Sequence, residues 1–198
     1  SDAVAHIRSP LVPHLFETWA DPRVTRNYAA QQRTSKMAGW PEKPWMDMPR
    51  GIVRGGTASI NGAVYIRGNA RDYDLWAELG ANGWSHADVL PLFKRAEDYA
   101  GPVSEFHGQG GPLAVRTLDR PTQAALAFCE AAAGHGFGGP DWDFNGARQH
   151  GGAGLYQFTM TADGQRASSA WGYLDNRSHP NLVERLGANA CRLQFDGK

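Results

Sequence analysis

The stretch Arg50-Gly-Ile-Val-Arg-Gly-Gly-Thr-Ala-Ser-Ile-Asn-Gly-Ala-Val-Tyr-Ile-Arg-Gly68 has the composition of a turn that is built around a ligand. Five glycines lie among small and β-branched residues, and Asn61 supplies the one amide side chain. The pair Gly55-Gly56 can adopt positive φ angles and lets a ligand approach the backbone closely. A glycine pair followed by a hydroxyl residue is a weak motif, so spacing alone also allows a plain turn that leads into a short strand at 63–66.

Composition excludes several classes of partner. The 198 residues contain 20 basic and 20 acidic side chains, and no basic run is present. Nucleic acids and anionic membranes require clustered positive charge, so neither is expected as a partner. No apolar run approaches the ~20 residues that cross a bilayer, so no membrane span is expected. The first residues also lack the pattern of a signal peptide.

The two cysteines, Cys129 and Cys191, are too few and too far apart for a disulfide framework or a metal motif. Both are expected to be buried free thiols, Cys129 in a helix and Cys191 in a strand. Free thiols favour a reducing compartment, and the expected location is the cytoplasm.

Hydrophobic periodicity and turn residues predict a mixed α and β chain. Residues 1–50 are rich in proline and are expected to be irregular. Helices are predicted at 69–79, 86–99 and 122–134, with a short one at 168–174, and strands at 63–66, 113–116, 155–160, 181–186 and 189–195.

Few residues outside the glycine-rich stretch have the pattern of a catalytic or metal site. The seven histidines are scattered without ligand spacing, so no zinc site is expected. His107 and His135 lie in glycine-rich loops and are expected at the surface. Asp141 and Asp143 form a carboxylate pair, but the run 141–146 is more typical of a turn. Serine-hydrolase and Walker motifs are not present.

The glycine-rich stretch and a series of later segments, taken in order along the chain, resemble the glucose–methanol–choline family of flavin oxidoreductases. The resemblance is strongest to its choline-dehydrogenase-like members. Residues 50–68 resemble the family's first signature. The other matching segments are Asp72-Tyr-Asp-Leu-Trp76, Gly83-Trp-Ser85, 88–97, His107-Gly-Gln-Gly-Gly-Pro-Leu113, Asp143-Phe-Asn-Gly146, Gly152-Ala-Gly-Leu-Tyr156, Gly164-Gln-Arg-Ala-Ser-Ser-Ala170, Tyr173-Leu174 and Pro180-Asn-Leu182.

The resemblance implies an α/β fold. It would be part of an FAD-binding domain of the Rossmann type, interleaved with part of a substrate domain built on an antiparallel sheet. Residues 1–100 would form a flavin-domain segment with a covering lid, 101–165 a substrate-domain segment, and 166–198 a return to the flavin domain. Relative to the family, the chain is expected to be an internal fragment. It would lack the Gly-x-Gly-x-x-Gly unit and the catalytic histidine with its partner, so no catalytic residue is assigned.

The resemblance also implies which residues contact FAD. The ribityl-pyrophosphate side would meet Val53, Gly55, Gly56 and Thr57. The isoalloxazine would meet Asn61, Gly62, Ala63 and Val64. Ala190 would contact the adenine from a strand. Ile60 stands where some relatives carry a flavin-linked histidine, so FAD is expected to bind without a covalent bond. Arg54 would meet a phosphate or point to solvent.

The implied reaction is oxidation of an alcohol to an aldehyde or ketone, with hydride passing to flavin N5. The partner would be a small-molecule alcohol, and the electron acceptor is left open between oxygen and a quinone. An FAD-containing hydroxynitrile lyase of the same fold is one alternative. Another is that the 198-residue chain alone binds no FAD and is inactive.

Overall fold

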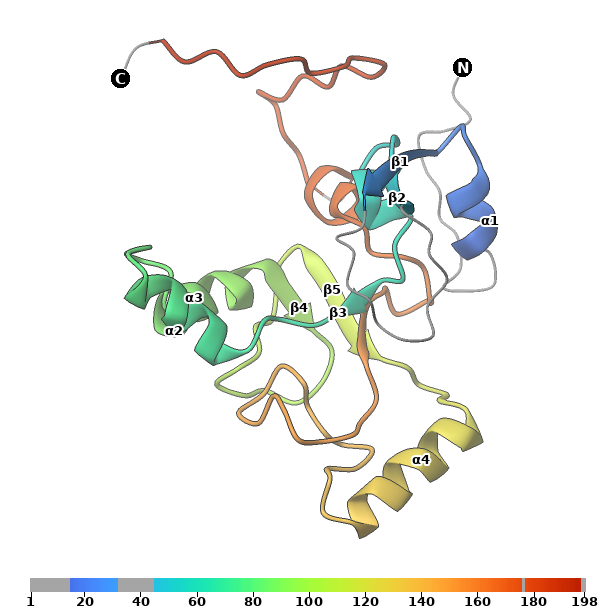
Figure 1. The fold of residues 1–198 in the computed structure, drawn as a ribbon, viewed down its shortest axis with the longest axis vertical. Helices are drawn as coiled ribbons and strands as arrows, with labels where there is room; N and C mark the ends of the chain where they lie inside the picture. The colour runs from blue at the N-terminus through green and yellow to red at the C-terminus, as the bar shows by residue number, and fades with distance from the viewer. Residues whose placement is uncertain (1–14, 32–44, 176, 197–198) are drawn as a thin grey trace.

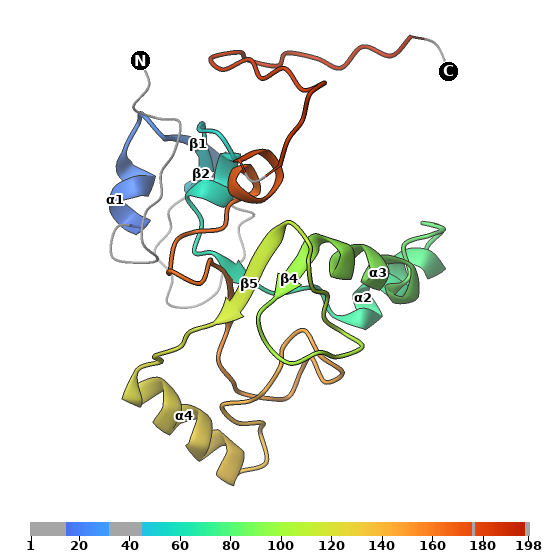
Figure 2. The same cartoon turned by 180° about the vertical axis from the view of Figure 1, so that it is seen from behind.

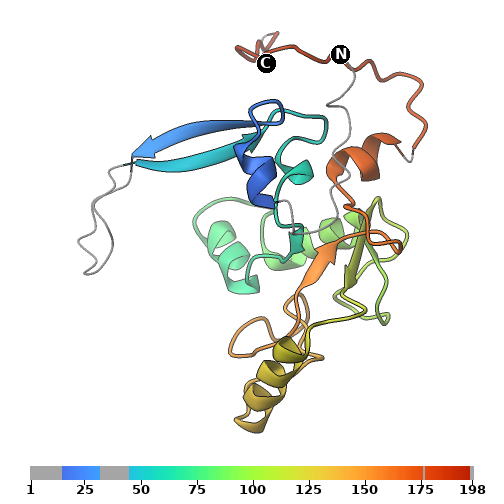
Figure 3. The same ribbon diagram turned by 90° about the vertical axis from the view of Figure 1, so that its right-hand side faces the viewer.

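The computed structural model describes residues 15–31, 45–175 and 177–196, and it begins with a helix and a two-stranded ribbon. α1 (Leu15–Ala20) precedes β1 (Thr25–Gln31), which pairs antiparallel with β2 (Trp45–Gly51). Figure 3 shows the ribbon projecting from the body. The irregular structure expected over 1–50 is therefore wrong at these elements, while residues 1–14 and 32–44 lie outside the described residues. Pro49 fits within β2 because both strands of a ribbon are edges.

A four-stranded sheet lies in the middle of the molecule, in the order β3-β6-β5-β4 (Figure 1). Its strands are β3 (Val64–Tyr65), β4 (Glu97–Tyr99), β5 (Leu113–Thr117) and β6 (Gln157–Thr159). β6 pairs antiparallel with both neighbours, and β4 pairs parallel with β5. The strands predicted near 63–66, 113–116 and 155–160 are confirmed. The sheet places the end of the glycine-rich stretch directly beside β6.

Two capped helices lie beside the β4 edge of this sheet (Figure 1). α2 (Ala70–Glu78) begins after Asn69, whose Oδ1 accepts from the backbone N–H of Arg71. α3 (His86–Ala96) begins with a capping box between Ser85 and Asp88. The first residues of both helices agree with the helices predicted at 69–79 and 86–99. α3 ends three residues earlier than predicted, because residues 97–99 extend and pair with β5.

α4 (Gln123–Gly134) confirms the helix predicted at 122–134 and is capped by Thr122, whose Oγ1 accepts from the Ala125 N–H. It lies at the end of the molecule away from the ribbon (Figure 2). Cys129 is buried and free on this helix, as expected. None of the described helices is both long enough and apolar enough to cross a membrane.

The last described segment, 177–196, is extended and exposed. It follows the short helical turn η3 (Trp171–Asp175) and runs away from the sheet in Figure 1. The strands predicted at 181–186 and 189–195 are not present, since no described segment pairs with this part of the chain. Cys191 is exposed rather than buried for the same reason.

Candidate functional site

A tight glycine turn connects β2 to the short 3₁₀ helix η2 (Gly56–Ser59). The Gly56 N–H donates to the Val53 carbonyl at 2.7 Å, and both Gly55 (φ 84°) and Gly56 (φ 58°) have left-handed backbones. A Cβ added to Gly55 would lie 2.5 Å from Ser59 Oγ, whereas one on Gly56 would have no atom within 4 Å. The first glycine is therefore enclosed by protein, and the second borders open space.

Side-chain hydroxyls hold this turn in place. The buried Ser59 Oγ donates to the Arg54 carbonyl at 2.8 Å, and Ser169 Oγ donates to the Gly55 carbonyl at 3.0 Å. Thr57 Oγ1 accepts from the Gly51 N–H at 3.2 Å. The Ser169 bond crosses 114 residues of sequence, so Ser169 and the neighbouring Ala170 lie against the turn at Gly55.

Asn61 holds the chain that follows the glycine turn through hydrogen bonds of its side chain. Its Oδ1 accepts from the Ala63 N–H at 3.0 Å and from Arg166 Nη1 at 2.8 Å. Ala63 is buried and has φ 57°, which is uncommon for a residue with a Cβ and needs support from its surroundings. The bond from Asn61, together with one from the Thr159 N–H to the Ala63 carbonyl (2.8 Å), supplies that support.

Ile60 is fully enclosed beneath the segment at 1% exposure. Its carbonyl accepts from Trp19 Nε1 at 2.8 Å, which attaches α1 to this region. The enclosed side chain is a saturated hydrocarbon and offers no atom for a covalent link.

Arg166 lies behind the same segment and is 4% exposed. Burial lowers the pKa of its guanidinium, and no carboxylate forms an ion pair with it in the described part of the chain. Sequence reasoning did not single out Arg166. The available signal was its position between small residues in the matching segment 164–170, where a charged side chain is unexpected.

Arg54 is paired within the chain and does not simply point to solvent. Its Nε and Nη2 each donate to Glu184 at 2.6 Å, and its Nη1 pairs with Asp175. These two carboxylates raise the pKa of the guanidinium further above its usual range, through hydrogen bonds that outweigh its burial. Arg54 thereby attaches the extended segment 177–196 to the glycine turn.

The structure brings together all the predicted contact residues except one. Val53, Gly55, Gly56, Thr57, Asn61, Gly62, Ala63 and Val64 lie on one continuous path from the turn into β3. Gly62, like Gly56, borders open space, and Val64 is 41% exposed. Ala190 lies instead in the exposed segment 177–196, and the strand expected there is not formed.

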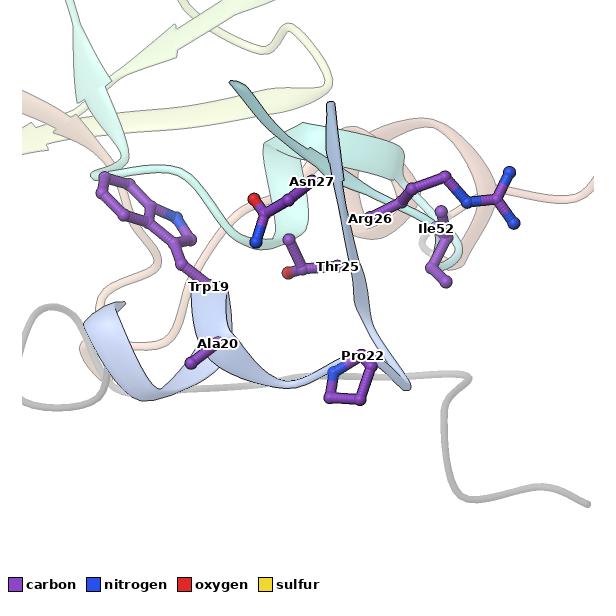
Figure 4. Close-up of a pocket in the computed structure, with 7 residues that line it drawn as sticks. All are labelled: Trp19, Ala20, Pro22, Thr25, Arg26, Asn27 and Ile52. Atoms are coloured by element: carbon purple, nitrogen blue, oxygen red, sulfur yellow. The ribbon is translucent and has the colours of Figure 1, made fainter. Parts of the chain in front are cut away.

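A hollow of about 360 Å³ lies on the ribbon side of this path (Figure 4). Its lining comes from α1, the start of β1 and the residue after β2: Trp19, Ala20, Pro22, Thr25, Arg26, Asn27 and Ile52. None of the predicted contact residues lines it. Trp19 lines the hollow and also donates to the Ile60 carbonyl on the predicted path.

A second polar site lies within the sheet and is centred on Glu97, which is completely buried. Its Oε2 accepts from Arg67 Nη2 and from the Gly108 N–H, each at 2.8 Å. Its Oε1 bonds to His107 Nδ1 at 2.9 Å. A buried carboxylate is stable only with such a set of donors. No group of three or more His, Cys, Asp or Glu side chains across 15–31, 45–175 and 177–196 is arranged to hold a metal ion.

His107 is buried, so its expected place at the surface is wrong. Its Nε2 bonds to Asp143 Oδ2 at 2.9 Å, and its ring stacks on Tyr99 with centroids 3.8 Å apart. Burial disfavours the charged ring, but the hydrogen bonds that the ring donates to Asp143 and Glu97 outweigh it and raise the pKa of His107 to about 9. The imidazole is therefore protonated at neutral pH, with one carboxylate on each nitrogen.

Asp143, expected only as a turn residue, also belongs to this network. It accepts from the Asn145 N–H, as a turn aspartate does, and from Gln157 Nε2, each at 2.9 Å. Burial raises the pKa of Asp143, but the hydrogen bonds with His107 and Asn145 lower it overall.

Asn145 joins the network to the end of the glycine-rich stretch. Its Nδ2 donates to the Tyr65 carbonyl at 3.1 Å, and its Oδ1 accepts from the Arg67 N–H at 2.8 Å. The buried network therefore fixes the chain on which the path from 53 to 64 ends.

Curated relatives cover most of this chain but extend well beyond it. An oxygen-dependent choline dehydrogenase of Brucella anthropi is 42% identical over 153 residues, which are 76% of this chain and 27% of that protein. The enzyme of the same name from Rhizobium rhizogenes is 48% identical over 126 residues, 64% of this chain and 22% of that protein. The chain thus spans about a quarter of the length of the curated relatives it matches.

Solved structures agree on the fold. Pyridoxine 4-oxidase from Mesorbium loti superposes with a TM-score of 0.65 at 23% identity, covering 86% of this chain and 33% of that one. An FAD-dependent oxidoreductase from Chaetomium thermophilum superposes with a TM-score of 0.58 at 26% identity, covering 67% of this chain and 24% of that one. The α/β fold expected from the sequence is confirmed. The sequence model of the GMC oxidoreductases matches residues 25–198, and with these relatives it shows that the chain belongs to the GMC oxidoreductase family.

Proposed function

We propose that the complete protein oxidises a small alcohol with FAD, and that residues 53–64 of this chain lie along the flavin. The observation that carries the proposal is the path from Val53 to Val64. It is fixed from behind by buried polar side chains and lined in front by glycines that border open space. Family membership and the names of the relatives support the same reaction class.

The residues on this path fit an FAD molecule. Gly56 and Gly62 border space that a Cβ would enter without touching protein, so a flat ring or a phosphate can approach the backbone there. Behind the path, the buried and carboxylate-free guanidinium of Arg166 suits an electron-rich ligand. A segment with these features is better matched by a flavin than by a neutral apolar ligand.

When bound, FAD would accept the hydride at N5. The residues of this chain would hold and orient it. Val53, Gly55, Gly56 and Thr57 would border its ribityl-pyrophosphate side, Asn61 to Val64 its ring, and Ala190 its adenine. Ser59 and Ser169 keep the turn rigid. Because the Ile60 side chain is enclosed and unreactive, we propose non-covalent binding.

We assign no catalytic base to the described residues. His107 has both ring nitrogens bonded to carboxylates, and its pKa is raised to about 9, so it holds its proton at neutral pH. A general base must release and accept protons near the working pH.

The first substrate to test is choline, because the curated relatives carry it in their names. The electron acceptor is oxygen or a quinone. We propose that the chain is divided into a flavin-domain segment (1–100), a substrate-domain segment (101–165) and a second flavin-domain segment (166–198). The free thiols of Cys129 and Cys191 favour a reducing compartment, for which we propose the cytoplasm.

The test uses protein expressed from the complete reading frame that encodes these residues. It is expected to purify with dissociable FAD, whose visible absorbance bleaches when choline or another primary alcohol is added without oxygen. A flavin that never bleaches with any alcohol would contradict alcohol oxidation and would favour a hydroxynitrile lyase, which carries out no net redox reaction.

A second test compares FAD binding by the 198-residue chain alone with FAD binding by the whole protein. We expect the 198-residue chain alone to bind no FAD, because it lacks the Gly-x-Gly-x-x-Gly unit that holds the dinucleotide. Titration of the chain with FAD, followed by flavin fluorescence, is expected to show no saturation. Binding at micromolar concentrations would contradict this expectation.

A further inference from the structure

The guanidinium of Arg166 is buried, and no charged side chain among the described residues compensates it. Nη1 donates to Asn61 Oδ1 at 2.8 Å and to the Ala58 carbonyl at the longer distance of 3.4 Å, while the buried Nε has no acceptor. Taking an ion out of water costs several kcal/mol unless an opposite charge offsets the loss, and arginine does not release its proton to avoid that cost. Negative charge from outside the described residues is therefore expected beside Arg166.

Two other arginines show that the missing carboxylate is the informative feature. Arg67 and Arg116 also have a buried Nε without an acceptor. Arg67, however, pairs with Glu97 at 2.8 Å, and Arg116 pairs with Asp119 at 3.0 Å. Arg166 differs from both because its only acceptors in the described part of the chain are an amide and a carbonyl oxygen.

Both acceptors of Arg166 belong to the path from 53 to 64. Asn61 Oδ1 receives two hydrogen bonds, from Arg166 and from the Ala63 N–H, so the orientation of the amide is fixed. The Nδ2 donors of Asn61 have no partner among the described residues and remain available to a ligand. Arg166 thus lies behind the residues proposed to face the isoalloxazine, and its charge acts on the same space.

We propose that Arg166 is a positioning residue that holds Asn61 toward the flavin ring and supplies the fixed positive charge that offsets the negative charge of the reduced isoalloxazine. This inference rests on the proposed function. A cation held in a site of low dielectric favours the electron-rich form of a nearby ring, so Arg166 raises the reduction potential of the flavin. The charge is fixed in advance by the chain and needs no rearrangement when the ring is reduced.

The test measures the midpoint potential of the bound flavin in the purified holoprotein from the complete reading frame. Arg166→Met is expected to lower the equilibrium constant for two-electron reduction about tenfold, a shift of about 30 mV to more negative potential. Arg166→Lys keeps the charge and is expected to shift the potential less. Arg116→Met is the matched control, since Arg116 also has a buried Nε without an acceptor in the described part of the chain but its charge is paired with Asp119; its potential should change less than that of Arg166→Met.

Three outcomes would overturn the inference. An unchanged potential in Arg166→Met would show that the charge does not act on the ring. A large loss of FAD affinity with an unchanged potential would show that it meets the diphosphate instead. Failure of both Arg166 variants to fold, while Arg116→Met folds, would show a purely structural role. A wild-type protein without flavin would contradict the proposed function itself, and this would be seen before any variant is made.

Discussion

His107 and Arg166 are both almost inaccessible to solvent, yet their surroundings differ. Each ring nitrogen of His107 bonds to a carboxylate. One of these carboxylates, Glu97, also accepts hydrogen bonds from Arg67 and from the Gly108 N–H. Across residues 15–31, 45–175 and 177–196, Arg166 meets only an amide and a carbonyl oxygen. The charge of His107 is balanced by carboxylates of the chain, whereas the charge of Arg166 has no such partner among the described residues and is proposed to meet a ligand. The comparison separates the polar network centred on Glu97 from the site that we propose to bind FAD.

The largest effect is expected from Glu97→Ala, which would leave Arg67 and His107 as buried cations without their shared carboxylate. The free energy of unfolding is expected to fall by about 3–5 kcal/mol. Urea denaturation of protein from the complete reading frame, followed by tryptophan fluorescence, measures it. Glu130→Ala, on an exposed position of α4 without an ion pair in the described structure, is the control and should stay within about 0.5 kcal/mol. A loss below about 1 kcal/mol for Glu97→Ala would show that the network is not structural.

A pH dependence is expected from His107. Its folded pKa of about 9 lies above the unfolded value of about 6.5, so its stabilisation is complete below about pH 6.5 and is lost as the pH rises through about 9. The loss is on the order of 3 kcal/mol, at 1.36 kcal/mol for each unit of pKa difference.

The measurement compares wild type with His107→Gln between pH 6 and pH 10 by thermal unfolding. The wild type should be more stable at low pH, and the difference should shrink as the pH rises. A difference that is constant across this range would contradict the protonated imidazole.

The local parts of the fold were readable from the sequence. Ser85 with Asp88 three residues later marks the start of α3, and Thr122 marks the start of α4, because capping depends on neighbours within one turn. The end of α3 was not readable, since residues 97–99 leave the helix to pair with β5. The strands predicted in 177–196 are absent because a strand requires a pairing partner, and this segment has none in the described structure.

In the candidate site, too, the features that depend on neighbouring residues could be predicted, and those that depend on distant residues could not. The path from Val53 to Val64 is continuous in sequence, so its glycines and Asn61 could be recognised as a unit. Arg166 reaches Asn61 across 105 residues, and His107 reaches Asp143 across 36. A histidine in a glycine-rich loop and an aspartate in a turn carry no local sign of burial. Only the folded chain shows that they are partners.

Two glycines on the path are expected to separate stability from FAD binding. Gly55→Ala would place a Cβ 2.5 Å from Ser59 Oγ at φ 84°, and the free energy of unfolding is expected to fall by about 1–3 kcal/mol. Gly62→Ala adds a methyl group where no atom lies within 4 Å, so stability should change by less than about 0.5 kcal/mol. Its FAD affinity should fall, because the methyl group enters the space proposed for the ring. Thermal unfolding and FAD titration give the two readings. Full FAD affinity in Gly62→Ala would contradict the proposed position of the ring.

Among the charged residues compared, the smallest effect is expected at Arg54, whose ion pairs with Asp175 and Glu184 lie near the surface. Arg54→Gln should lower the free energy of unfolding by at most about 1 kcal/mol, because solvent and salt screen such pairs. Arg23→Gln, which removes an exposed pair with Asp21 two residues away, is the control and should have less effect. The deficit of Arg54→Gln should shrink in 1 M NaCl, where the Debye length is about 3 Å, whereas the deficit of Glu97→Ala should persist because its pairs are buried. Equal salt dependence for the two variants would show that Glu97 is solvated, and it would remove the distinction between the closed network at His107 and the open charge at Arg166.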